Sequence, residues 1–107
     1  MSRTLARGQV WWTESPSLGR RPVAILTRDE SLRVLGRVLV APATTTIRSL
    51  PTEVYLDERD GMPRACVLNL DTPELLLRSF FIDYITVLSL VRQEEVCRAL
   101  SVAVGCT

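Results

Sequence analysis

The stretch Gly-Arg-Arg-Pro-Val-Ala-Ile-Leu-Thr, residues 19–27, decides the fold because a charged turn runs directly into a buried strand. Its apolar half, residues 23–27, has the composition of a core strand, whereas the arginines before Pro22 stay at the surface. A second apolar run, residues 38–41, opens in the same way into Pro-Ala-Thr-Thr-Thr at residues 42–46. We therefore expect two neighbouring strand ends to present a guanidinium and a hydroxyl to one point. That pair is suited to binding and reacting a phosphodiester.

Length and composition predict one domain over residues 1–107, with room for a modest core. Hydrophobic residues make up 47% of the sequence, which is more than a monomer of this size hides easily, so we expect a homodimer. No apolar run approaches the roughly 18 residues that cross a bilayer, and no basic-then-apolar signal segment opens the chain. We expect a cytoplasmic protein that does not enter a membrane.

All 13 basic residues are arginine. Every cation is therefore planar, permanently protonated and able to grip a phosphate through two parallel hydrogen bonds. The absence of histidine excludes an imidazole general base and histidine-rich metal sites. Cys66, Cys97 and Cys106 form no CxxC pair, so neither a disulfide framework nor a zinc site is indicated. We expect no metal and no cofactor.

Apolar and β-branched segments predict six short strands at residues 7–13, 21–27, 36–43, 52–58, 65–70 and 80–88. A mobile, turn-rich loop is expected at 14–20, one helical turn at 28–33 and a short helix at 72–76. The last segment differs in kind, because Ser89 can cap a helix with helical apolar spacing and Gly105 can stop it. The pattern predicts a mainly β protein with α: a small, curved antiparallel sheet or barrel closed by one helix.

Three motifs follow one another in a recognisable order. Residues 7–12 are Arg-Gly-Gln-Val-Trp-Trp, residues 20–27 are Arg-Arg-Pro-Val-Ala-Ile-Leu-Thr, and residues 38–44 are Val-Leu-Val-Ala-Pro-Ala-Thr. Each motif is short, but their order and spacing extend over nearly the whole chain. In both respects the sequence resembles the MazF/Kid/PemK toxins, the endoribonuclease halves of bacterial toxin–antitoxin pairs.

The resemblance implies an SH3-like antiparallel β-barrel with a C-terminal α-helix, and a homodimer. It implies an endoribonuclease that cleaves single-stranded RNA at selected sequences without a metal ion. It also implies a cognate antitoxin whose extended, acidic tail occupies the RNA groove. The family's catalytic positions correspond to Arg21, directly before the proline, and Thr44, at the end of the third predicted strand.

Metal-free RNA cleavage uses the substrate's own 2′-hydroxyl as nucleophile and leaves a 2′,3′-cyclic phosphate and a 5′-hydroxyl. Arg21 can stabilise the charge that develops on the phosphoryl oxygens, and Thr44 can hold the phosphate in line. Arginine is a poor base because its pKa lies above about 12. The candidates for the general base are Glu14 and Asp71.

Further residues near these positions are candidates for RNA binding. They are Trp12, Arg20, Thr45, Thr46, Arg48, Asn69 and Arg78. Trp11 and Trp12 point to opposite faces of one strand, so one is expected in the core while the other stacks on a base or closes the dimer. The alternative for the arginines, including Arg64, is a solvated surface position, and for the threonines a strand exit that satisfies turn amides.

Two other functions remain open at this point. A CcdB-like gyrase poison, which blocks its target through C-terminal residues and cuts nothing, shares the expected fold. It would need an aromatic-glycine terminus, and residues 104–106 supply only the glycine. The second alternative is an inactive relative of these toxins that only sequesters the antitoxin.

Overall fold

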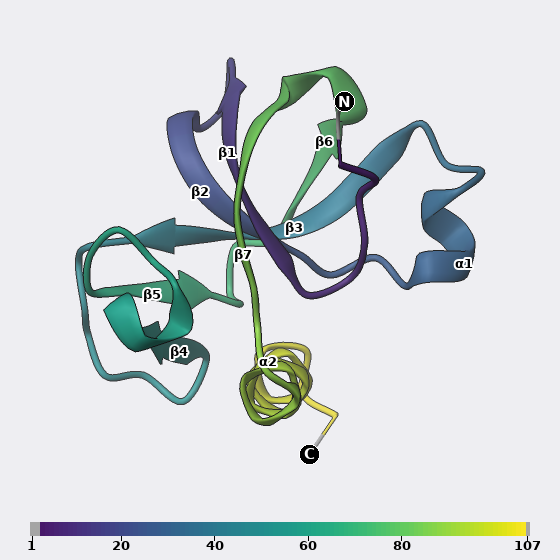
Figure 1. Ribbon diagram of the computed structural model, residues 1–107. Helices are drawn as coiled ribbons and strands as arrows, with labels where there is room; N and C mark the ends of the chain where they lie inside the picture. The colour runs from purple at the N-terminus through teal and green to yellow at the C-terminus, as the bar shows by residue number, and fades with distance from the viewer. Residues whose placement is uncertain (1–2, 107) are drawn as a thin grey trace.

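The computed structural model describes residues 3–106 as a strongly curved antiparallel sheet with one long helix packed against it (Figure 1). Seven strands form the sheet in this part of the chain, and short helical turns lie in the connections. In chain order the elements are β1 Gln9–Ser15, β2 Gly19–Ile25, α1 Asp29–Leu32, β3 Arg37–Thr44, β4 Glu53–Leu56, η1 Glu58–Asp60, β5 Cys66–Asn69, β6 Glu74–Leu77, η2 Arg78–Phe80, β7 Phe81–Val87 and α2 Leu90–Ala103. The predicted mainly β fold with a C-terminal α-helix is confirmed.

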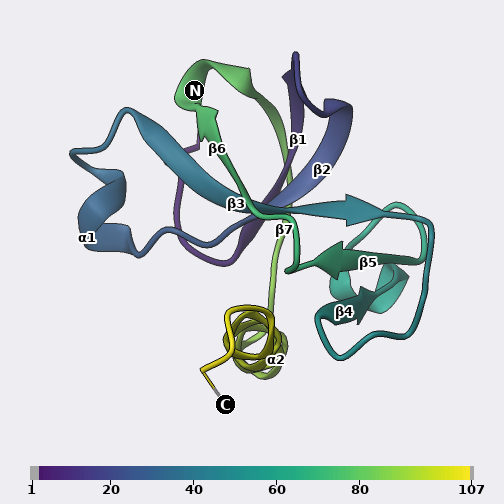
Figure 2. The same ribbon diagram turned by 180° about the vertical axis from the view of Figure 1, so that it is seen from behind.

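The sheet is curved but not closed, so the prediction of a barrel is wrong in this respect. Strand pairing runs in the order β4-β5-β3-β2-β1-β7, with β6 joined to β3 outside this path. Within residues 3–106, no pairing links the outer strands β4 and β7. Helix α2 packs beside β4 and covers the core at this opening, where a barrel would need another strand pair (Figure 2).

The core consists of two apolar clusters, one on each face of the sheet. Successive residues of β1 and β2 alternate between them, as the period of two along a strand requires. Val10 and Ala24 join Val96 and Ala99 of α2 in the first cluster, and Trp11 joins the second. Trp11 is 6% exposed, so it is the core member of the tryptophan pair.

Residues 72–76, for which a short helix was expected, lie largely in strand β6. Leu75 and Leu76 pair with Leu39 and Val38 of β3. Leu76 is buried whereas Leu75 is exposed, so these residues follow the two-residue period of a strand. Pairing with β3 therefore overrides the local helix preference of the leucines.

The predicted mobile loop over 14–20 is instead a β-hairpin. Glu14 and Ser15 continue β1 and pair with Arg20 and Gly19 at the start of β2. Gly19 has a φ of +66°, which suits the left-handed position that closes a three-residue hairpin turn. The hydroxyl of Ser15 also accepts a hydrogen bond from the Leu18 N–H, so the turn is held from inside.

Helix α2 begins and ends where the sequence predicts. The Ser89 side chain caps it by accepting a hydrogen bond from the Arg92 N–H, and Gly105 follows its end with a φ of +75°. Val96 and Ala99 are buried, whereas Val104 is 63% exposed and does not extend the apolar face. No helix within residues 3–106 combines the length and apolar character needed to cross a bilayer.

An ion pair joins α2 to the turn η1. The Arg92 guanidinium donates from Nε to Asp60 Oδ1 at 2.9 Å and from Nη1 to Glu95 Oε1 at 2.9 Å. Partial burial of Asp60 alone would raise its pKa. The hydrogen bonds from Arg92 and the Asp57 N–H, with the charges of Arg92 and Arg59, outweigh burial and hold this pKa below its ordinary 3.8.

Gly61, which follows η1, is expected not to tolerate a side chain. Its φ is +89°, and a methyl group there would clash with the Thr86 side chain. Gly61→Ala is therefore expected to lower the free energy of unfolding by at least about 1–2 kcal/mol, as measured by urea unfolding. Gly36→Ala is the matched control, because the space around Gly36 is open. Equal midpoints for the two variants would contradict this expectation.

Asp60→Asn is expected to lower the free energy of unfolding by about 1–3 kcal/mol at pH 7. Because the pKa of Asp60 is lowered by folding, its stabilisation is complete above the ordinary 3.8 and is lost as the pH falls through the folded-state value. The difference between wild type and variant should therefore shrink below that pH. Urea unfolding at neutral and acidic pH measures it, and a difference that grows in acid would count against the assignment.

Candidate active site

A surface cavity of about 350 Å³ lies where strands β2 and β3 separate. Their pairing ends at Val23 and Pro42. Beyond that point β2 pairs only with β1, and β3 turns to β5 by pairing Thr44 with Val67. Pro22 and Pro42 have no N–H to donate to a ladder, which favours the end of pairing at this position. The two proline-containing motifs therefore favour the opening between the strands.

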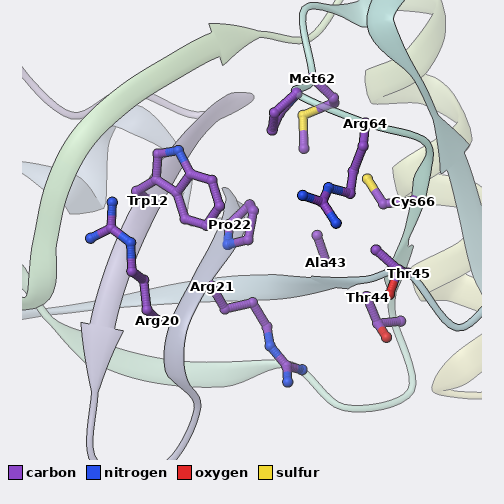
Figure 3. Close-up of a pocket in the computed structure, with 11 residues that line it drawn as sticks. Trp12, Arg20, Arg21, Pro22, Ala43, Thr44, Thr45, Met62, Arg64 and Cys66 are labelled. Carbon is purple, nitrogen blue, oxygen red and sulfur yellow. The ribbon is translucent and has the colours of Figure 1, made fainter.

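The cavity brings together two predicted catalytic residues, Arg21 from β2 and Thr44 from β3. Both line it, and in Figure 3 both side chains extend from their strands on the same side of the view. Its remaining lining residues are Trp12, Arg20, Pro22, Ala43, Thr45, Met62, Pro63, Arg64 and Cys66. The structure therefore places Arg21 and Thr44 on the wall of one cavity, and their chemical role there stays a prediction.

Arg21 is fixed at its backbone and free at its tip. The buried hydroxyl of Thr13 donates to the Arg21 carbonyl at 2.9 Å. Among the described residues, no hydrogen bond or ion pair engages the half-buried Arg21 side chain. Arg21 was expected at the first residue of a strand, but it is the third residue of β2. What ends near Arg21 is the pairing of β2 with β3, not the strand itself.

The Thr44 hydroxyl is held in place by a backbone hydrogen bond. Its Oγ1 accepts a hydrogen bond from the Thr46 N–H at 3.1 Å. Among the described residues no acceptor binds the Thr44 hydroxyl proton, so this proton is available to donate to a bound anion. Thr46 itself is exposed and does not line the cavity, whereas Thr45 does.

The lining carries three arginines and no carboxylate. The Arg20 guanidinium lies over the Trp12 ring, 5.0 Å from its centroid, so these two form a stacked pair at one side (Figure 3). Arg64 reaches in from the loop before β5 on the other side. Three permanent positive charges without a lining acid make the cavity attractive to an anion.

Of the wall formed by Met62, Pro63, Arg64 and Cys66, only Arg64 was considered from the sequence, which favoured a solvated surface position for it. The sequence signals a turn near Gly61, but nothing in it indicates that the turn folds back against β2 and β3. Cys66 is buried, and its pKa is raised by burial first and then by the negative charges of Asp60 and Asp57. Its thiol is therefore protonated at neutral pH and a poor nucleophile.

Neither candidate base lines the cavity. Glu14 is exposed on β1 opposite Arg20 in the hairpin. The Asp71 carboxylate accepts a hydrogen bond from the Thr52 hydroxyl, and its N–H donates to Asn69 Oδ1. Asp71 and Asn69 thus form a local turn after β5, held away from the lining.

Two further predicted RNA-binding residues also lie outside the lining. The backbone N–H of the exposed Arg48 donates to Glu53 Oε1, in the loop that follows Thr46. The Arg78 guanidinium donates to the Leu32 carbonyl at 2.6 Å, which ties it to α1. Within residues 3–106, no group of three or more His, Cys, Asp or Glu side chains could hold a metal ion.

Sequence comparison finds relatives along the whole chain, although no protein-family model matches it. A Mycobacterium tuberculosis protein named probable endoribonuclease MazF5 is 44% identical over 108 residues, covering 100% of this chain and 99% of that protein. Another from the same species, named probable endoribonuclease MazF2, is 38% identical over 103 residues, covering 95% of this chain and 100% of that protein.

The solved structures that are similar to this chain also include a MazF toxin and an endoribonuclease. The Mycobacterium tuberculosis toxin MazF-mt6 aligns with a TM-score of 0.85 at 28% identity, over 92% of this chain and 98% of its own. A mycobacterial endoribonuclease in complex with its cognate antitoxin aligns with a TM-score of 0.86 at 27% identity, over 96% and 97%. With 44% identity to a MazF protein over its full length, the chain belongs to the MazF family of endoribonuclease toxins.

Proposed function

We propose that this protein is a toxin that cleaves single-stranded RNA at selected sequences without a metal ion. The observation that carries the proposal is the convergence of Arg21 and Thr44 on a cavity lined by three arginines and no acid. Relatives named as endoribonucleases support it along the whole chain. The same comparisons do not favour the alternative of a CcdB-like gyrase poison.

In the proposed reaction the RNA supplies its own nucleophile. The 2′-oxygen forms a bond to the adjacent phosphorus while the bond from phosphorus to the 5′-oxygen breaks. The proton of the 2′-hydroxyl passes to a base, and the departing 5′-oxygen takes up a proton. The products are a 2′,3′-cyclic phosphate and a 5′-hydroxyl.

Arg21 and Thr44 act on the phosphate in this scheme. The guanidinium of Arg21 has no competing acid among its described contacts, so it can donate two hydrogen bonds to the non-bridging oxygens. The hydroxyl of Thr44, whose oxygen is held by the Thr46 N–H, donates its proton to the same group and keeps it in line. Both interactions strengthen as negative charge develops.

Glu14 is the better of the two candidate bases. The carboxylate of Asp71 is already bound by the Thr52 hydroxyl in the turn after β5. Glu14 stands opposite Arg20 in the hairpin, and Arg20 lines the cavity, so an RNA strand crossing the hairpin would bring its 2′-hydroxyl near this carboxylate. We assign Glu14 as the general base of the bound complex.

Stacking and charge bind the RNA around the reacting phosphate. Trp12 and Arg20 offer an aromatic ring and a guanidinium plane to an unstacked base. Arg64 and Thr45 line the cavity beside them and contact neighbouring phosphates or sugars. Thr46, Arg48, Asn69 and Arg78 lie outside the lining and are proposed to bind RNA only as it extends over the surface.

The antitoxin and the homodimer belong to the same proposal. A solved mycobacterial relative is in complex with its cognate antitoxin. An extended acidic segment would fit a cavity lined by arginines and exclude RNA from it. Self-association is supported by exposed apolar side chains at the start of α2, where Leu90 is 78% and Val91 64% exposed.

Cleavage of a mixed-sequence RNA is expected in excess EDTA, with cuts at defined sequences and 5′-hydroxyl ends. A single 2′-deoxy substitution at a mapped site should abolish cleavage there, because it removes the nucleophile. End mapping on sequencing gels measures both. Continued cutting at the 2′-deoxy site would rule out the mechanism. Inhibited supercoiling without cuts would support the gyrase poison, and antitoxin binding without cuts the inactive relative.

Arg21→Ala is expected to lower kcat for RNA cleavage by at least about 10²–10³-fold, because it removes a charged donor from the transition state. Circular dichroism should be unchanged, since the Arg21 side chain makes no described contact on which the fold depends. Arg33→Ala, an exposed substitution next to α1, is the control and should cleave normally. Near-normal turnover by a well-folded Arg21→Ala protein would defeat the assignment.

A further inference from the structure

One wall of the cavity is a loop rather than a strand. Residues 61–65 connect η1 to β5 and supply Met62, Pro63 and Arg64 to the lining. Strand pairing holds the opposite walls, β2 and β3, in place. The loop needs other contacts to keep Arg64 at a fixed distance from Arg21 and Thr44.

The contacts that hold this loop lie at its η1 end. The Asp57 side chain accepts from the Arg59 N–H, and the Asp57 N–H donates to Asp60 Oδ2, so η1 is closed by a reciprocal cap. Met62 is 4% exposed in the core and its N–H donates to the Asp57 carbonyl. From Pro63 to Ala65 the residues are exposed and belong to no helix or strand.

Two groups outside the loop fix its position in the molecule. The Thr86 hydroxyl of β7 donates to the Asp60 carbonyl at 3.0 Å. The Arg92 guanidinium of α2 donates to both oxygens of the Asp60 carboxylate, at 2.9 Å and 3.4 Å. Arg92 is itself steadied by Glu95 on the next turn of the helix. Asp60 is thus a point at which β7 and α2 hold the loop wall of the cavity, beside the buried Met62.

Asp60 and Arg64 are four positions apart in the chain, a distance of at most about 13–14 Å. A change at Asp60 therefore reaches Arg64 through Gly61, whose left-handed backbone packs against Thr86, and through buried Met62. We propose that the Asp60–Arg92 pair positions Arg64 for RNA, so that helix α2 sets the width of the cavity from the far side of the wall. This rests on the proposed function and adds to it two residues that do not touch RNA.

Arg92→Gln is expected to raise KM for a short RNA by about 3–10-fold with kcat within about twofold of wild type, because ground-state and transition-state binding weaken together. Asp60→Asn should do the same. Arg92→Lys, which keeps a charge within reach of Asp60, should restore much of the loss. Arg98→Ala removes an exposed arginine from the same helix and should change neither constant.

The decisive comparison is made in an Arg64→Ala background. If Arg92 acts through Arg64, Arg92→Gln should add little to the KM already raised by Arg64→Ala. An equal additional rise in both backgrounds, or an unchanged KM in Arg92→Gln, would overturn the inference. Binding of a non-cleavable 2′-deoxy analogue, with circular dichroism to verify folding, gives the same comparison without turnover. Wild-type protein that neither binds nor cleaves RNA would instead refute the proposed function, and the inference with it.

Discussion

The end of the β2–β3 ladder is the constraint on which the functional geometry depends. Pairing stops at Val23 and Pro42, and the strands then find different partners, β1 for one and β5 for the other. A continuous ladder would place these backbones about 5 Å apart, which leaves no room for a substrate between them. The opening instead lets Arg21 and Thr44 face a shared space while their backbones stay in the sheet.

The cavity combines rigid and adjustable walls. Arg21 is held by the Thr13 hydroxyl at its backbone, and Thr44 by pairing with Val67. These two act on the reacting phosphate in our proposal, where small displacements cost most. Arg64, by contrast, sits on a loop that follows Asp60, and Asp60 is ion-paired with Arg92 of α2. A loop of this kind suits groups that bind and select a substrate, because their geometry tolerates more variation than that of groups acting on the reacting atoms.

The part of the site that lies on strands β2 and β3 could be predicted from the sequence, whereas the part on the 61–65 loop could not. Arg21 and Thr44 could be predicted because each follows from a strand-end motif, and Ser89 and Gly105 because helix caps are local. Strand β6 could not be predicted, because its leucine-rich sequence also suits a helix and only the pairing with β3 makes it a strand. The placement of Arg64, and the failure of the sheet to close into a barrel, depend on contacts between distant segments. Local patterns do not encode such contacts.

The only charged side chains in the cavity lining are arginines, so in our proposal the groups that bind the phosphate are different from the group that removes the proton. Guanidinium groups are charged at any physiological pH, and the lining holds three of them, while the raised pKa of Cys66 keeps its thiol neutral. In our proposal the cavity therefore attracts phosphate with constant strength near neutral pH. Such a site holds and polarises an anion but does not take its proton. In our proposal, proton removal therefore falls to a group outside the lining, the exposed Glu14 carboxylate opposite Arg20 in the hairpin, which leaves the positive charge of the cavity unchanged.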